Sequence, residues 1–347
     1  IIVELPGVKD SQQAIETLEK IRFELTRGSS RKFQQAVAPV FFEMASLLLS
    51  QPGTAAEVSA NLRLVRGTIE ELKLAEIQDY FDDDCVIEKE EAAALDELAA
   101  NAAVIYPIIF DDRLEVLTSR GGTISRHTVN VDRKTLTATV REFRQNLERR
   151  PTHRYRESGR RLYEWLIAPV VADLRRDKVT TLIFVPDGPL RGIPPAALYD
   201  GTRFLIEEFS VSTTLGLSLT SPRPIPRDSV RLLAAGLTVG REGVSPLPGV
   251  AAELEEVTRI YDSTELRDDK FRVDAVTDEL SAGNYSVVHI ATHGQFNSDF
   301  RKSFLLAYDG RITMDALEQT VGRRRFHTEP VELLMLSACE TAAGDDQ

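Results

Sequence analysis

Apolar residues in the first hundred positions recur three or four residues apart, which is the spacing of one face of an α-helix. Three such stripes are separated by residues 27–30 and 51–54, two stretches of turn-forming residues. The stripes consist of Ile15, Leu18, Ile21 and Leu25; of Phe33, Val37, Val40, Phe41, Met44, Leu47 and Leu48; and of Leu62, Val65, Ile69, Leu72 and Ile77. The pattern predicts a helical region over residues 1–98 that begins with a helical hairpin.

Beyond residue 100, short apolar runs that predict strands alternate with helical stripes. Residues 102–110 are apolar and branched, Asp111-Asp112 is typical of a tight turn, and residues 114–118 are expected to return as the hairpin partner. Residues 181–185 form another buried-strand run, which ends at the turn-forming residues 186–189. Two helices are predicted between these runs, one with Leu136, Val140, Phe143 and Leu147, and a longer one with Leu162, Trp165, Leu166, Val170 and Leu174.

Three prolines within residues 222–226 mark a linker, because proline favours extended backbone and donates no hydrogen bond. After it, residues 231–237, 287–291 and 333–336 predict strands, and Pro248-Gly249 opens a helix. Strands that alternate with helices predict an α/β fold, here a mostly parallel sheet with helices on both faces. We therefore predict three parts: a helical region (1–98), a first α/β layer (99–226) and a second α/β layer (227–347).

Composition narrows the classes of function. A formal charge of −12 disfavours general nucleic-acid or membrane-surface binding, since both depend on clustered positive charge. The sequence has no apolar run long enough to span a bilayer and does not start like a signal peptide, so we expect a cytoplasmic protein. The two cysteines, Cys85 and Cys339, predict neither a disulfide framework nor a cysteine-based zinc site.

Two of the predicted strands run into side chains that can take part in covalent chemistry. His293 follows the strand at 287–291, and Cys339 follows the strand at 333–336, 46 positions after the histidine. Because reactive groups gather at the carboxyl ends of parallel strands, we expect the two side chains to meet at one edge of the sheet. The imidazole can take the thiol proton, and the thiolate can attack a carbonyl carbon. The N–H groups of Gly294 and Cys339 are the expected donors to the resulting oxyanion.

The two motifs around these residues, HIATHG at 289–294 and SACETAAG at 337–344, resemble the signatures of the CHAT domain family. Members are caspase-like cysteine peptidases of clan CD, related to separase and often fused to tetratricopeptide (TPR) repeats. The segments FVPDGPLRGIPPAAL at 184–198 and AVIYP at 103–107 also resemble the family, so that the resemblance covers roughly residues 60–347.

This resemblance implies a caspase-like α/β/α sandwich preceded by helices that end a TPR-like array. Residues 99–226 would be an inactive layer, and residues 227–347 would carry the His293 and Cys339 dyad. The implied activity is endopeptidase cleavage of a protein substrate without a cofactor, regulated by a protein partner that binds the helices. Since SACET replaces the Gln-Ala-Cys of caspases, their preference for aspartate is not carried over. CHAT domains usually continue well beyond the cysteine motif, so we also expect this chain to be incomplete at its C-terminus.

Simpler roles are expected for several neighbouring residues. His289 lies inside a predicted strand and is read as a packed, hydrogen-bonded core histidine, and Asp187 is read as a turn former rather than a substrate-pocket acid. A cysteine after a strand is by itself usually a small core residue, and the pairing with His293 favours catalysis here. The alternative function is a catalytically weak or inactive CHAT scaffold that acts as a protein-interaction module.

Overall fold

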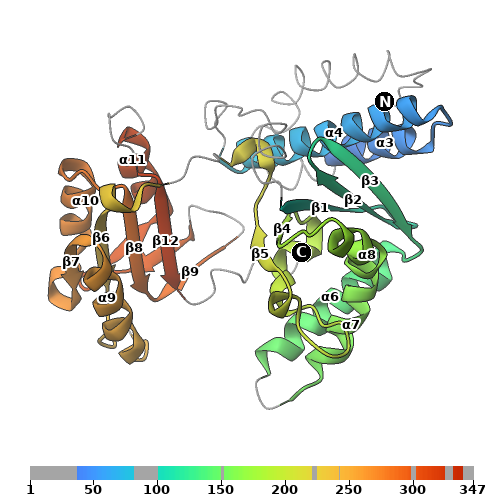
Figure 1. The fold of residues 1–347 in the computed structure, drawn as a ribbon. Helices are drawn as coiled ribbons and strands as arrows, with labels where there is room; N and C mark the ends of the chain where they lie inside the picture. The colour runs from blue at the N-terminus through green and yellow to red at the C-terminus, as the bar shows by residue number, and fades with distance from the viewer. Residues whose placement is uncertain are drawn as a thin grey trace. The chain divides into compact units, whose positions relative to one another are not determined.

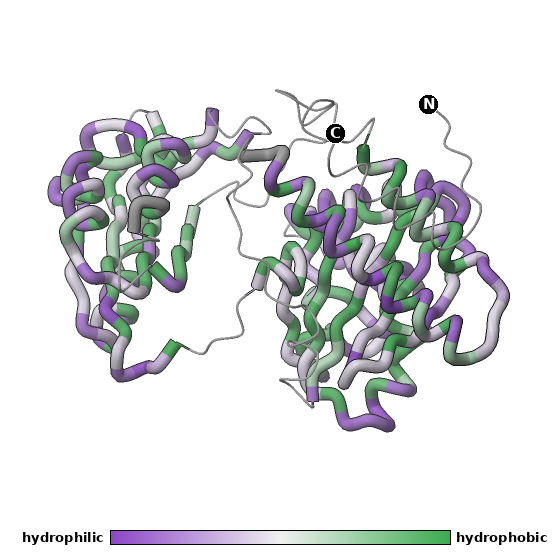
Figure 2. The backbone as a smooth tube through the Cα atoms, turned by 90° about the horizontal axis from the view of Figure 1, so that it is seen from above, coloured by the Kyte–Doolittle hydropathy of each residue, from purple (hydrophilic) through white to green (hydrophobic). Residues whose placement is uncertain are grey.

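The computed structural model describes residues 37–81, 101–149, 152–220, 225–241, 243–297, 302–324 and 331–338. The chain divides into two compact units, unit 1 (Ile1–Pro222) and unit 2 (Arg223–Gln347) (Figure 1). No helix within the described ranges is long and apolar enough to cross a membrane. Figure 2 shows hydrophilic and hydrophobic positions alternating along the helices, as expected for helices with one buried face.

The described part of unit 1 begins with two helices joined by a short loop, α3 (Ala38–Ser50) and α4 (Ala55–Phe81). The helix start of α4 is fixed by a reciprocal cap in which the Thr54 N–H donates to the Glu57 carboxylate at 2.7 Å. Most residues of the two predicted stripes are buried, including Phe41, Met44, Leu48, Leu62, Val65 and Ile69, but Leu47 is 49% exposed. The helical prediction is confirmed here, whereas the stripe at 15–25 lies outside the described residues.

A five-stranded sheet forms the centre of unit 1. Its strands are β1 (Ala102–Ile109), β2 (Leu114–Arg120), β3 (Thr123–Val129), β4 (Thr181–Phe184) and β5 (Ser210–Thr213), in the order β3-β2-β1-β4-β5. The predicted hairpin is confirmed, since β1 and β2 pair antiparallel with Ile109 opposite Leu114. Strands β1, β4 and β5 are parallel to one another. One face packs on α3 and α4 and the other on α6 to α8, which gives three layers.

The helices on that second face are α6 (Arg133–Glu148), α7 (Tyr155–Leu166) and α8 (Ala168–Arg176). The prediction of one long helix through Leu162 and Leu174 is wrong, because the helix breaks at Ile167. Pro169 explains the break: it has no N–H to donate, and its ring clashes with the carbonyl four residues earlier. Helix α8 restarts with this proline in its first turn, where the missing donor costs nothing.

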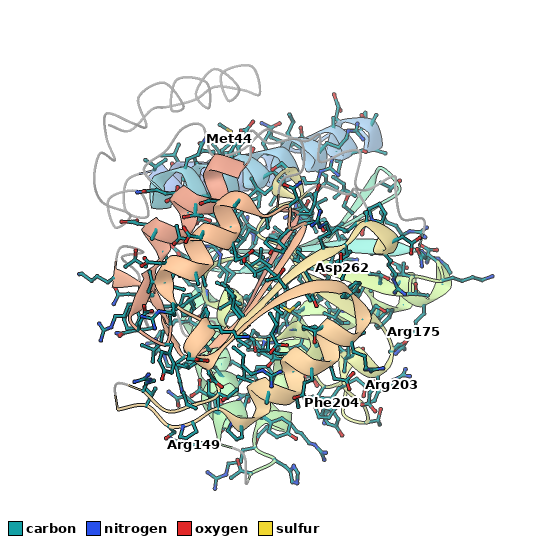
Figure 3. The ribbon with its side chains drawn as sticks, turned by 90° about the vertical axis from the view of Figure 1, so that its left-hand side faces the viewer. Met44, Arg149, Arg175, Arg203, Phe204 and Asp262 are labelled. Carbon is teal, nitrogen blue, oxygen red and sulfur yellow. The ribbon has the colours of Figure 1, made fainter. Side chains whose placement is uncertain are left out.

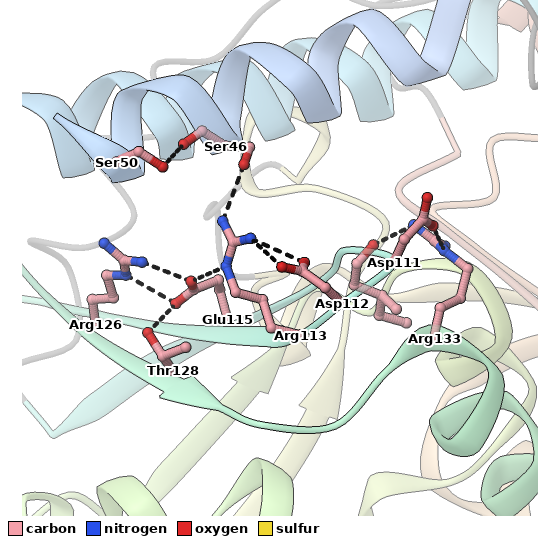
Figure 4. Close-up of polar contacts among 10 residues, drawn as sticks. Ser46, Ser50, Asp111, Asp112, Arg113, Glu115, Arg126, Thr128 and Arg133 are labelled. Atoms are coloured by element: carbon pink, nitrogen blue, oxygen red, sulfur yellow. Dashed lines mark hydrogen bonds and ion pairs between the residues drawn. The ribbon is translucent and has the colours of Figure 1, made fainter.

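Buried carboxylates tie both α3 and α4 to this layer. The Glu115 carboxylate on β2 is fully buried and accepts hydrogen bonds from Arg113 and Arg126, each at 2.7 Å (Figure 4). The two arginines reach on to α3, where Arg113 donates to the Ser46 hydroxyl at 3.0 Å and Arg126 to the Leu49 carbonyl at 2.6 Å. Burial acts to raise the pKa of Glu115, but the hydrogen bonds from the arginines outweigh it and hold the pKa below its ordinary value.

Helix α4 is attached to the same layer through two buried charged side chains, Glu70 and Lys73. Glu70 is 4% exposed and accepts from the Tyr106 hydroxyl at 2.8 Å and from the Leu217 and Ser218 N–H groups, each at 3.0 Å. One turn later, the Lys73 ammonium group lies 2.6 Å from the Asp187 carboxylate, with both residues more than nine-tenths buried. Helix α4 is therefore held by charged groups as well as by its apolar face.

A tight turn between β4 and β5 carries a carboxylate with a large change in pKa. Asp200 accepts hydrogen bonds from the Thr202 N–H at 2.7 Å and the Arg203 N–H at 2.8 Å. Partial burial works against ionisation, but these donors outweigh it and lower the pKa of Asp200 from 3.8 to about 2. Arg203 and Arg175, labelled in Figure 3, both also pair with Glu208.

An Asp200→Asn variant is expected to be less stable than the unaltered chain by about 1 to 2 kcal/mol at pH 6. Because the folded-state pKa is depressed, this stabilisation is present above about pH 4 and is lost as the pH falls from about 4 toward about 2. Urea unfolding followed by the fluorescence of Trp165, the single tryptophan and a residue of unit 1, measures the difference. A difference that stays constant between pH 6 and pH 3 would contradict the assignment.

Unit 2 is built on a parallel sheet in the order β12-β8-β6-β7. The strands are β6 (Arg231–Gly236), β7 (Asp262–Arg267), β8 (Val287–Thr292) and β12 (Leu333–Ala338). Helix α9 (Pro248–Ile260) packs on one face, and α10 (Val273–Ala282) and α11 (Met314–Arg324) pack on the other. A small antiparallel sheet of β9 (Gly294–Gln295), β10 (Phe304–Leu306) and β11 (Arg311–Thr313) follows β8 in the chain. The mixed α/β architecture with preceding helices confirms the predicted caspase-like fold class.

Candidate active site

His293 lies at the carboxyl end of β8, as predicted, and its position is fixed on both sides. Thr292 before it is 1% exposed and donates its hydroxyl to the Leu306 carbonyl at 2.5 Å. The Leu306 N–H in turn donates to the His293 carbonyl at 2.8 Å. The imidazole is half-buried, so the backbone is held while the ring keeps contact with solvent.

One ring nitrogen of His293 already has a partner. Its Nε2 lies 2.8 Å from the carbonyl oxygen of Ser245, in the loop between β6 and α9. A carbonyl oxygen can only accept, so Nε2 carries the hydrogen and donates. In the neutral ring this leaves Nδ1 as the basic nitrogen. No sequence pattern predicts the role of Ser245, because the contact uses a backbone atom and spans 48 residues.

The register of the parallel sheet brings the two predicted motifs alongside each other. Strand β12 pairs with β8 from Leu333 opposite Val287 to Ala338 opposite Thr292. His293 is the residue after Thr292, and Cys339 is the residue after Ala338. Cys339 itself lies outside the described residues, as does Cys85, so the dyad stays a prediction.

Neighbouring atoms lie so close to Gly294 that there is no room for a side chain at this position. A Cβ atom at this position would lie 2.9 Å from the Phe296 ring, 3.1 Å from the Ala338 Cβ and 3.2 Å from Leu305. All three distances are shorter than ordinary van der Waals contact between carbon atoms. Gly294 therefore allows the segment after His293 to lie against the end of β12.

Replacing Gly294 by alanine is expected to destabilise unit 2 by about 1 to 3 kcal/mol, because the added methyl group overpacks this contact. Hydrogen exchange in β8 and β12, followed by mass spectrometry, measures the effect locally. Gly249→Ala is a matched control, since a Cβ there meets nothing within 4 Å and alanine favours the helix. Equal protection from hydrogen exchange in both variants would show that the close contact at Gly294 does not contribute to stability.

A pocket of about 380 Å³ opens beside these strand ends. It is lined by Leu247, Pro248, Gly249, Val250, Glu253, Thr292, Ser337 and Ala338. The first five belong to α9 or the residue before it, and the last three to the ends of β8 and β12. Gly236 lets α9 lie close to the sheet, because a Cβ there would stand 2.7 Å from Val250 and 2.8 Å from the Ala291 carbonyl oxygen.

His289 is 3% exposed, which confirms its buried position, but the hydrogen bond predicted for it is not found among the described residues. Its Nε2 lies 3.0 Å from the Glu253 carboxylate, close enough for an ion pair. The angles do not make this contact a hydrogen bond, and neither ring nitrogen has one within the described part of the chain. The pair is an electrostatic contact.

Asp187, in unit 1, has a role that the sequence did not predict. Its carboxylate is 6% exposed and bound to Lys73, so it is the anion of a buried ion pair rather than a free acid in a substrate pocket. The two residues are 114 positions apart, and no local pattern connects them. Among the described residues, no group of three or more metal-binding side chains is present.

These features define a caspase-like α/β protein with a histidine at the end of a parallel strand. A sequence profile of the CHAT domain matches residues 156–347, more than half of the chain. The chain therefore belongs to the CHAT domain family. The match begins in α7 and includes all of unit 2. Among curated proteins, no match to the chain is found.

Proposed function

We propose that the protein is a cysteine endopeptidase of the CHAT type, with Cys339 as nucleophile and His293 as general base and acid. The observation that carries the proposal is the pairing of Ala338 with Thr292, the residues directly before Cys339 and His293. Opposite residues of adjacent parallel strands are about 5 Å apart, so the next residue of each strand starts from neighbouring positions. A protein substrate and a cytoplasmic setting, where thiols stay reduced, belong to the proposal.

The contacts of His293 suit this chemistry. With Nε2 donating to the Ser245 carbonyl, Nδ1 can accept the thiol proton of Cys339. The thiolate sulfur then bonds to the scissile carbonyl carbon, and the imidazolium returns the proton to the amine as the C–N bond breaks. Water hydrolyses the thioester and releases the second product. The Ser245 carbonyl orients the ring throughout, as the third group of such sites does.

Backbone hydrogen bonding in the small sheet leaves Gly294 available as an oxyanion donor. The Leu306 N–H donates to the His293 carbonyl, which makes this the hydrogen-bonded pair of the β9–β10 ladder. Gly294 is opposite Leu305, and adjacent pairs in an antiparallel ladder alternate between bonded and non-bonded. The Gly294 N–H therefore points away from β10. Together with the Cys339 N–H, it can stabilise the negative oxygen of the tetrahedral intermediate.

The α/β layer of unit 1 is the inactive layer in this proposal. Residues 99–226 contain no cysteine, so they cannot supply a thiol nucleophile. The helices before this layer remain the proposed site of a regulatory protein partner. Their buried contacts through Glu115, Glu70 and Lys73 attach them firmly to the layer they would influence.

A peptide acyloxymethyl ketone tests the proposal, because it alkylates a nucleophilic cysteine that recognises the peptide. We expect labelling of Cys339 but not of Cys85, the other cysteine of the chain, as mapped by peptide mass spectrometry. Equal labelling of both cysteines, or of Cys85 alone, would refute a catalytic role for Cys339. Comparing protein N-termini in cells with the unaltered chain and with Cys339→Ala would then identify the substrate.

A further inference from the structure

The pocket beside the strand ends is almost uncharged, with one exception. Its walls are apolar or small residues and the hydroxyl-bearing Thr292 and Ser337, and Glu253 is the single ionisable residue among the described residues that line it. A volume of about 380 Å³ lies at the lower end of the range of small-ligand pockets, which suits one side chain rather than a large group. The pocket therefore combines room for an aliphatic stem with one negative end.

The Glu253 carboxylate is partly satisfied and partly free. One oxygen faces His289 at 3.0 Å, and the side chain is 36% exposed. A carboxylate can accept about four hydrogen bonds, so capacity for a further donor remains. Cationic donors make the strongest hydrogen bonds to such a group, and a guanidinium can approach with two parallel N–H groups.

The start of α9 is an opposing influence, because the first N–H groups of a helix favour anions. Pro248 removes one of these N–H groups, and the Val250 N–H is turned back to the Leu247 carbonyl at 3.1 Å. The helix terminus is equivalent to about half a positive charge, whereas Glu253 carries a full negative charge. The sum of these two contributions is negative.

The position of the pocket relates it to the reaction. Thr292 and Ala338 line it and directly precede His293 and Cys339. A side chain placed here belongs to a residue next to the scissile bond. We propose that the pocket takes the cationic side chain, lysine or arginine, of the residue on the amino side of that bond. Glu253 is the specificity-determining residue, and this inference rests on the proposed peptidase function.

Three peptide acyloxymethyl ketones that differ only in the residue next to the warhead test this inference. The residues are arginine, its uncharged isostere citrulline, and aspartate. We expect Cys339 of the unaltered chain to react at least about tenfold faster with the arginine probe than with either other probe. Equal rates for arginine and citrulline, or a faster rate for aspartate, would overturn the inference and leave the peptidase proposal standing.

Variants of α9 locate the effect. Glu253→Gln is expected to remove the preference for arginine over citrulline. Glu256→Gln is the matched control, because it makes the same change of charge on the same helix at a side chain that is 66% exposed and paired with Arg259. The preference should persist in this control. If both variants lose it equally, the effect is one of overall charge and the role of Glu253 is wrong.

Binding without reaction separates the two proposals. Benzamidine, a small amidinium compound, is expected to bind the Cys339→Ala chain and to bind Cys339→Ala/Glu253→Gln at least about tenfold more weakly, as measured by calorimetry. If none of the three ketone probes labels Cys339 but benzamidine binds in this Glu253-dependent way, the peptidase function fails and the cation pocket holds. If benzamidine binding is absent or independent of Glu253, the pocket assignment is wrong whatever the probes show.

Discussion

Replacing Lys73 by methionine is expected to lower the free energy of unfolding of unit 1 by about 3 kcal/mol. Methionine preserves much of the apolar stem but removes the ammonium group, so the Asp187 carboxylate, 6% exposed, loses the cation 2.6 Å away. Arg191 lies 3.7 Å from the same carboxylate, but it is also paired with Glu76. Its partial compensation places the effect at the lower end of the range for breaking a buried pair.

Urea unfolding monitored by Trp165 fluorescence measures this loss in unit 1. Arg176→Met is a suitable control, since Arg176 is 67% exposed and its pair with Asp173 should contribute less than about 1 kcal/mol. The double variant Lys73→Met/Asp187→Leu is expected to recover most of the stability, because no uncompensated charge stays buried. A cost below about 1 kcal/mol for Lys73→Met alone would show that the pair contributes no more than a surface one.

A His293→Ala variant is expected to react with the peptide ketone at Cys339 at least about 100-fold more slowly than the unaltered chain. The reason is the loss of the general base, which typically contributes a factor of 10² to 10⁴ to such reactions. The second-order rate constant of labelling, measured by intact mass, gives the effect directly. Circular dichroism checks that unit 2 remains folded without the contact to Ser245.

His153→Ala provides the control for this second prediction. His153 is exposed, lies in unit 1 and contacts Tyr155, so its loss should leave the labelling rate unchanged. An unaltered rate in His293→Ala would remove His293 from the mechanism, even if Cys339 is reactive. Equal slowing in both variants would point to a general effect of the substitutions.

The interior strands of both sheets are predictable from the sequence, and the reason is their burial. Strands β1, β4, β6 and β8 each have neighbours on both sides and form apolar runs. Strands β3, β5 and β7 are edge strands with mostly polar or exposed residues, and their sequences give no strand signal. The apolar run at 333–336 does predict β12, although two of its large side chains, Leu333 and Met335, remain exposed at this edge of the sheet.

Some parts of the candidate site are likewise predictable from the sequence, and others are not. The position of His293 at a strand end follows from local pattern, and the structure confirms that placement. The contacts of its ring with the Ser245 carbonyl, and of Glu253 with His289, depend on how a loop and a helix fold back over the sheet. Pairings between residues 36 or 48 positions apart leave no periodic signal. For Cys339 the sequence remains the source of the assignment.

The polar anchoring of α4 has a mechanical consequence. The helix advances about 1.5 Å per residue, so sliding it by a single residue would separate Lys73 from Asp187 and Glu70 from Ser218 together. Each of these buried groups would then lack a partner, and intermediate positions would be high in energy. Unlike a helix held by apolar contacts alone, α4 cannot shift gradually. These contacts fix a single register of α4 against the segments that follow β4 and β5.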